Sequence, residues 1–185
     1  MKESSQADKA RSTGFTLLEA LVVLTLLAVL LGLVAPGLSG LRSRQQLQAR
    51  AEDFWGSLML ARAQAVLLQQ HVTVCTASAE GLCDAGVAWH DGWIVFADGN
   101  RNGQIEPGER VLLQRAAVAG VFIAGNSTVD HVMGYGANGR SENRAGGFQA
   151  GTIRICSPGQ AEGWQVVINA VGRPRLEKAG MPGCP

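Results

Sequence analysis

The first strong pattern in the chain is a long apolar run near its beginning. Residues 15–35 are almost all apolar and carry a single charge, that of Glu19. A run of about twenty such residues is the length that an α-helix needs to cross a bilayer. We therefore expect a transmembrane helix over residues 15–35. Because a carboxylate in an apolar medium is costly, we expect Glu19 to have a cationic partner.

A second pattern follows Pro36, where apolar residues return every three or four positions. This spacing places them on one face and predicts that the helix continues over residues 36–69, with a kink near Pro36. The apolar positions are Leu41, Leu47, Ala51, Phe54, Trp55, Leu58, Ala61, Ala65 and Leu68. A helix with one apolar face needs a sheet to cover it.

Short β-rich runs fill the rest of the chain, separated by Gly, Asn, Asp and Pro. They are residues 71–76, 92–96, 110–115, 118–124, 151–156 and 163–168. Runs of this length between turn residues predict antiparallel strands in one or two packed sheets. The expected fold class is α+β, with a long N-terminal helix packed on an antiparallel, β-sandwich-like domain over residues 70–185.

Four cysteines add covalent links to this picture. The chain has 185 residues and a formal net charge of +1. When residues 1–35 are set aside, the remaining length is enough for one domain with a buried core. In an oxidising compartment, an even cysteine count indicates two disulfides, for which three pairings are possible. We favour Cys75–Cys83 and Cys156–Cys184. A zinc site is disfavoured because there is no Cys-x-x-Cys and the three histidines are scattered.

The residues before the apolar run have the character of a leader. Residues 1–14 are short, polar and basic, and they end at Gly14-Phe15. A secretory signal is cut after its apolar core, whereas this junction lies before it.

The arrangement resembles the class III signal of type IV pilins and pseudopilins. That resemblance implies removal of residues 1–14 by a prepilin peptidase after Gly14 and methylation of Phe15. It also implies that Glu19 pairs with a neighbouring subunit's N-terminus. The alternative is a plain anchor.

A second resemblance lies farther along the chain. Gly92-Trp-Ile-Val-Phe96 is followed by Asp98-Gly-Asn-Arg-Asn-Gly103 and Glu106-Pro-Gly-Glu109. This succession resembles the signature of the GspH/FimT family of minor pilins and pseudopilins, and the likeness covers nearly the whole chain. It implies a single-pass protein of the bacterial inner membrane with a periplasmic C-terminal domain, which later joins a type IV pilus at the cell surface. Its implied partners are other minor pilins and the major pilin.

Residues 98–109 also match a calcium-binding pattern. Positions 1, 3, 5 and 12 of an EF-hand loop are occupied by Asp98, Asn100, Asn102 and Glu109. An EF-hand needs a helix on each side, whereas the flanking runs have the pattern of strands. We therefore favour a hairpin turn in which Asn and Asp side chains bond to local backbone groups. Calcium binding is the less favoured alternative.

Positive charge is concentrated near the C-terminus. Residues 132–185 carry six Lys or Arg against three Asp or Glu, whereas residues 15–131 carry seven against ten. Two arginines flank a proline in Gly172-Arg173-Pro174-Arg175, which we place on a solvent-exposed turn held apart from the sheet. Arginine suits phosphate because it is always charged and can bond two oxygens at once. A solubilising basic turn is the plainer interpretation.

The same four residues resemble the Gly-Arg-x-Arg motif by which some FimT-type minor pilins bind DNA in natural transformation. The resemblance implies that the pilus takes up extracellular double-stranded DNA, and that the protein contacts the phosphate backbone of that DNA. Such contacts do not depend on base sequence and weaken with salt. The candidate DNA-binding residues are Arg173, Arg175, Lys178, Arg140, Arg144 and Arg154.

The sequence offers no pattern typical of an enzyme. No nucleophile and general base are spaced as in a known catalytic motif, and no Gly-rich loop precedes a helix to hold phosphate. We expect no catalytic residues and no cofactor. Two other roles for a pilin-like chain stay open. One is a structural minor pilin that primes pilus assembly, and the other is a minor pseudopilin of a type II secretion system.

Overall fold

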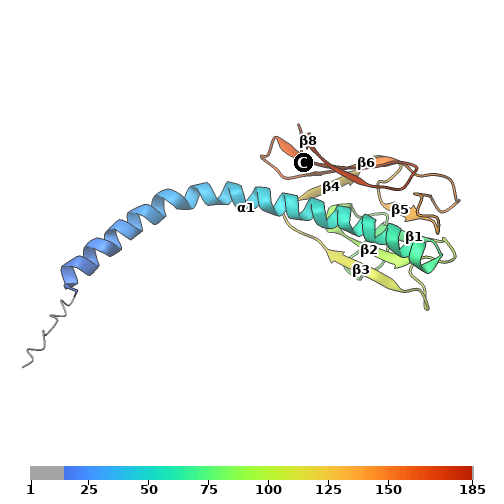
Figure 1. Cartoon of the computed structure of the whole chain (residues 1–185), viewed down its shortest axis with the longest axis horizontal. Helices are drawn as coiled ribbons and strands as arrows, with labels where there is room; N and C mark the ends of the chain where they lie inside the picture. Colours follow the sequence, from blue (N-terminus) through green and yellow to red (C-terminus); the bar gives the residue numbers. More distant parts are fainter. Residues whose placement is uncertain (1–14, 185) are drawn as a thin grey trace, which may run out of the picture. The chain divides into compact units, whose positions relative to one another are not determined.

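Figure 1 shows a computed structural model of the chain, which describes residues 15–184 and leaves out the side chains of residues 32–39. The chain divides into two compact units, residues 1–42 and 43–185. Helix α1 (Leu17–Leu68) belongs to both units and runs without interruption through position 36. Its bounds agree with the helix expected over residues 15–69. The leader over residues 1–14 lies outside the described residues.

The first unit contains the beginning of α1. The Thr16 hydroxyl accepts a hydrogen bond from the Glu19 backbone N–H at 3.2 Å, so Thr16 caps the first turn. Apolar side chains between residues 17 and 31 are exposed in this single chain. Among the side chains that are described, no helix offers an apolar stretch long enough to cross a membrane. The predicted span over residues 15–35 includes undescribed side chains and stays a prediction.

The second unit contains two four-stranded sheets in which all neighbouring strands are antiparallel. The first sheet has the order β3 (Val111–Ala116), β2 (Gly92–Ala97), β1 (Val72–Thr76) and β5 (Val132–Tyr135). The second has the order β4 (Phe122–Gly125), β6 (Gly151–Cys156), β7 (Glu162–Ile168) and β8 (Arg175–Gly180). A short 3₁₀ helix, η1 (Trp89–Asp91), precedes β2. The α+β fold class expected from the sequence is confirmed.

Two strands were not expected, and one expected strand is shorter. β5 is only four residues long and contains Gly134, so its β-propensity is weak. β8 carries Arg175, Glu177 and Lys178. These charges suit an edge strand, but they obscure the alternation of apolar and polar positions by which a strand is predicted. The prediction that residues 172–175 stand apart from the sheet was wrong for Arg175, which begins β8, whereas residues 172–174 lie outside the strands. The run over residues 118–124 forms a strand only from Phe122.

The core lies where α1 meets both sheets (Figure 1). The helix contributes the apolar face predicted from its period, namely Leu47, Ala51, Phe54, Leu58, Ala61 and Ala65, all buried. The ring of Phe54 packs edge-on against Trp89 and Trp93, with centroids 5.3 and 5.0 Å apart. Because one helix face touches both sheets, α1 sets their mutual arrangement.

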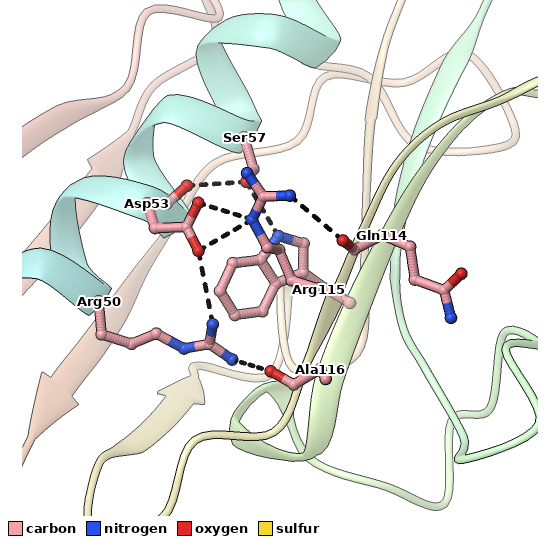
Figure 2. Close-up of polar contacts among 7 residues, drawn as sticks. Arg50, Asp53, Ser57, Gln114, Arg115 and Ala116 are labelled. Atoms are coloured by element: carbon pink, nitrogen blue, oxygen red, sulfur yellow. Dashed lines mark hydrogen bonds and ion pairs between the residues drawn. The ribbon is translucent and has the colours of Figure 1, made fainter.

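A polar cluster fastens α1 to the edge of the first sheet (Figure 2). The Arg115 Nε–H donates to both carboxylate oxygens of Asp53, at 2.8 and 3.0 Å. Arg50 lies 3.4 Å from the same carboxylate and donates to the Ala116 carbonyl oxygen. Burial lowers the pKa of Arg50, and the Asp53 carboxylate opposes that effect. The cluster therefore gives Arg50, which is only 7% exposed, both a counter-charge and a hydrogen-bond acceptor.

The four cysteines form two disulfides, in the pairs favoured from the sequence. Cys75 of β1 joins Cys83, and this bond closes a short loop beside the first sheet. Cys156 at the end of β6 joins Cys184 and ties the end of the chain to the second sheet. The described residues contain no free cysteine.

Tyr135, in β5, gives a prediction about stability. Its side chain is fully buried, its hydroxyl has no hydrogen-bond partner among the described residues, and burial raises its pKa. A buried hydroxyl without a partner opposes folding. We expect Tyr135→Phe to leave the free energy of unfolding unchanged or to raise it by up to about 1 kcal/mol in urea titrations. A loss of more than about 1 kcal/mol would reveal a partner for the hydroxyl, such as an internal water.

Candidate functional site

The Gly-Arg-Pro-Arg segment starts from a tight turn that requires its glycine. The backbone N–H of Gly172 donates to the Asn169 carbonyl oxygen at 2.8 Å, and Gly172 has a φ of 82°. A Cβ at this position would collide with the backbone of Gly139 and Ser141. The turn therefore needs glycine both for its conformation and for close contact with the neighbouring loop.

Pro174 anchors the segment and leaves its two arginines in solvent. Pro174 is buried, whereas Arg173 and Arg175 on either side are exposed. The Pro174 carbonyl oxygen accepts a hydrogen bond from the indole N–H of Trp55, on α1, at 3.0 Å. An extended backbone turns alternate side chains to opposite sides, so both guanidiniums face away from the core.

A second basic turn lies against the first. Arg140 is exposed on the turn over residues 136–141, whose backbone contacts Gly172. The hydroxyl oxygen of Ser141 lies 2.7 Å from the Asn169 carbonyl oxygen, and the Arg62 Nε–H donates to the Gly139 carbonyl oxygen at 2.8 Å. These contacts place Arg140 next to the segment that carries Arg173. Arg62 adds a fourth cation, beside the three arginines that the two turns carry.

The other candidate residues on the second sheet lie on opposite faces of it. Arg154 pairs with Gln165 and Gln165 with Glu177, so these residues share the outer face, and Arg175 lies two positions from Glu177. The Arg175 Nε atom is 3.4 Å from a Glu177 carboxylate oxygen, which partly offsets the positive charge there. Lys178 lies on the opposite face, with its ammonium 5.5 Å from the ring centroid of Trp164.

Arg144 belongs to a different part of the surface. Its guanidinium covers Gly103 in the loop that follows β2, so closely that a side chain at position 103 would displace it. It also borders a small depression beside the Cys75–Cys83 disulfide. The structure thus brings together Arg140, Arg173 and Arg175, places Arg154 farther along the outer face, and separates Lys178 and Arg144 from them.

The loop over residues 98–109 is held by its own Asx side chains. One Asp98 carboxylate oxygen accepts from the Thr73 hydroxyl at 2.6 Å and from the Gly103 N–H at 3.0 Å. Asn100 and Asn102 accept from backbone N–H groups two residues on, and a Glu109 oxygen accepts from the Glu106 N–H. These bonds are of the kind that the turn interpretation predicts. In the described part of the chain, no three His, Cys, Asp or Glu residues are grouped to hold a metal ion.

The sequence did not indicate the cluster of titratable side chains beneath this loop. Asp98 is fully buried and His71 is 3% exposed, and burial lowers the pKa of His71. Glu142 lies 3.6 Å from the His71 ring and 3.3 Å from the Arg101 guanidinium. His71, Glu142 and the loop that carries Asp98 and Arg101 lie far apart in the sequence, so no local spacing connects these three segments. Trp55 and Arg62 were missed as supports of the arginine turns for the same reason.

The predicted processing residues lie at the other end of the chain. Gly14 falls outside the described residues. Phe15 is 80% exposed, and Glu19 lies exposed in the first turn of α1. No residue of the described single chain forms an ion pair with Glu19 within 4.0 Å.

A helix that starts close to a methylation-type motif and packs its second half on two antiparallel sheets defines a pilin-like protein. The model of the prokaryotic N-terminal methylation motif matches residues 9–35. The family model described as type II transport protein GspH matches residues 50–172. The chain therefore belongs to the GspH family, as its sequence motifs indicated.

Solved structures with the same fold include a type IV minor pilin and a minor pseudopilin. The type IV minor pilin FimU of Pseudomonas aeruginosa is 22% identical, with a TM-score of 0.53 over 72% of this chain and 90% of the FimU chain. The minor pseudopilin EpsH from the type II secretion system of Vibrio cholerae is 15% identical, with a TM-score of 0.52 over 75% of this chain and 98% of the EpsH chain. A search of the curated proteins found no match. The protein has the fold of minor pilins and pseudopilins.

Proposed function

We propose that this protein is a minor type IV pilin that binds extracellular double-stranded DNA for uptake in natural transformation. The observation that carries the proposal is the exposure of Arg173 and Arg175 on either side of the buried Pro174, beside the turn that carries Arg140. Three guanidiniums on adjacent, anchored segments can contact phosphates of one backbone. Such contacts give affinity without base specificity.

The proposed membrane anchoring, processing and assembly all depend on the N-terminal segment. Residues 15–35 anchor the chain in the inner membrane, a prepilin peptidase cuts after Gly14, and Phe15 is methylated. Glu19 then pairs with the N-terminus of a neighbouring subunit as the protein joins the pilus near its tip, among other minor pilins and the major pilin. The match to the methylation motif over residues 9–35 supports the processing step at the N-terminus. Retraction of the pilus would draw bound DNA toward the cell.

Removal of the two central arginines tests the proposal. We expect Arg173→Ala/Arg175→Ala to weaken binding of a labelled duplex to the full chain in detergent at least tenfold. The negative slope of log K against log salt should become shallower by about 2, because two phosphate contacts are lost. Fluorescence anisotropy between about 50 and 200 mM salt measures both quantities.

A matched variant controls for net charge. Arg44→Ala/Arg110→Ala removes two exposed arginines from α1 and from the segment before β3, and it should keep most of the affinity. Equal binding by the wild type and the Arg173→Ala/Arg175→Ala variant would refute the site.

The fold supports a second candidate role in assembly. The GspH family match and the likeness to the pseudopilin EpsH fit a structural minor pilin or a minor pseudopilin of a type II secretion system equally well. In that case the wild-type chain would not bind DNA, and its deletion would reduce piliation or secretion. The exposed arginine pair is the observation that favours the DNA-binding role.

A further inference from the structure

The two basic turns of the DNA site are fastened to the same face of helix α1. The Trp55 indole N–H donates to the Pro174 carbonyl oxygen, and the Arg62 Nε–H donates to the Gly139 carbonyl oxygen. Trp55 and Arg62 are seven residues apart, which is two turns or about 10 Å along a helix and returns to nearly the same face. One rigid element therefore holds two loops that are distant in sequence.

Each of these hydrogen bonds acts next to an exposed arginine. Pro174 lies between Arg173 and Arg175, and Gly139 directly precedes Arg140. Both donors are half-buried, so their hydrogen bonds are shielded from competing water. The contact of Gly172 with the Gly139 backbone joins the two turns directly. Fixing the two carbonyl groups thus fixes the backbone from which all three guanidiniums project.

We propose that Trp55 and Arg62 are positioning residues of the DNA site, which hold the two basic turns in one arrangement before DNA arrives. This inference rests on the proposed DNA-binding function. Ordering a flexible, charged segment at the moment of binding costs affinity, and preorganisation removes that cost. The number of phosphates contacted does not depend on the two donors. Their loss therefore lowers the affinity and leaves the salt dependence of binding unchanged.

Two conservative variants test this role in the full chain. Trp55→Phe keeps an aromatic ring and removes the indole N–H, whereas Arg62→Lys keeps the charge and removes the guanidinium Nε–H. We expect each to raise the dissociation constant for a labelled duplex about three- to tenfold, with an unchanged slope of log K against log salt. Arg173→Ala/Arg175→Ala, by contrast, should reduce the slope.

The matched control is Trp89→Phe. The Trp89 indole also donates to a backbone carbonyl, that of Val129, at 2.9 Å, and Trp89 is fully buried away from the basic turns. We expect Trp89→Phe to lower the melting temperature at least as much as Trp55→Phe and to leave DNA affinity unchanged. A loss of affinity that simply followed lost stability in all three variants would overturn the positioning role.

Amide hydrogen exchange without DNA tests the restraint itself. Trp55→Phe should speed exchange in residues 172–177 and leave β6 unchanged. If Trp55→Phe and Arg62→Lys bind and exchange like the wild type while Arg173→Ala/Arg175→Ala loses affinity, the DNA site stands and the positioning role is wrong. If Arg173→Ala/Arg175→Ala also binds normally, the proposed function fails, and the positioning role fails with it.

Discussion

Replacing Phe54 with alanine should lower the free energy of unfolding by about 3–5 kcal/mol. Phe54 is fully buried where α1 meets both sheets, and its ring packs edge-on against Trp89 and Trp93. The substitution removes the apolar surface of the ring and leaves a cavity between two large aromatic residues that cannot easily collapse. Since a domain is stable by only about 5–15 kcal/mol, the change takes a large share of the total.

Urea unfolding followed by tryptophan fluorescence measures this effect. Phe54→Leu fills most of the space of the phenyl ring, so we expect it to lower the free energy of unfolding by less than half as much as Phe54→Ala does. Leu67→Ala serves as a matched control, because Leu67 lies on the same helix and is 73% exposed. Its effect should stay within about 0.5 kcal/mol. A loss below about 1 kcal/mol for Phe54→Ala would mean that the core does not depend on this contact.

The second large effect is expected at Asp53. Asp53→Asn keeps the shape of the side chain but removes the charge that balances Arg50 and Arg115 (Figure 2). Because Arg50 is only 7% exposed, it would stay buried without a counter-charge. We expect a loss of about 3 kcal/mol, near the lower end for breaking a buried ion pair, since Arg115 is more exposed.

The neighbouring residue supplies the control for this experiment. Glu52→Gln removes one negative charge from the exposed face of the same helix turn, where Gln48 is the one side chain among the described residues that donates a hydrogen bond to Glu52. Its effect on the free energy of unfolding should stay below about 0.5 kcal/mol. Equal effects of the two substitutions would show that the cluster adds nothing to stability. High salt should narrow the difference mainly by screening the pair with Arg115, whose side chain is 39% exposed, and should affect the pair with Arg50 less, because that side chain is 7% exposed.

Patterns with a short period predicted most of the fold. The helical face from Leu47 to Ala65 is the buried face, and the runs at Gly151–Cys156 and Glu162–Ile168 are strands. β8 escaped prediction because its charges break the alternation of apolar and polar positions that marks a half-buried strand. An edge strand needs few apolar residues, so its composition resembles that of a turn.

The candidate site was predicted only in part, for a similar reason. Arg173 and Arg175 are neighbours in sequence, so the motif shows them together. The hydrogen bond from Trp55 to Pro174 joins residues 119 positions apart, and an apolar residue at helical spacing indicates only that it faces the core. Likewise, the sequence grouped Arg144 and Lys178 with the arginine pair by charge. Packing places one over Gly103 and the other over Trp164.

The contact between Gly172 and Gly139 bears on how such a motif is used to search for related proteins. The glycine in Gly-Arg-Pro-Arg is required by a backbone 33 positions earlier, which leaves no room for a Cβ. The backbone N–H of Gly172 already donates to the Asn169 carbonyl oxygen. Because the crowding atoms belong to the main chain, which every residue has, we expect homologues with this turn to keep glycine at position 172 independently of the side chain at position 139. Pairs of arginines that lack this preceding glycine would then mark chains in which the basic segment is differently placed.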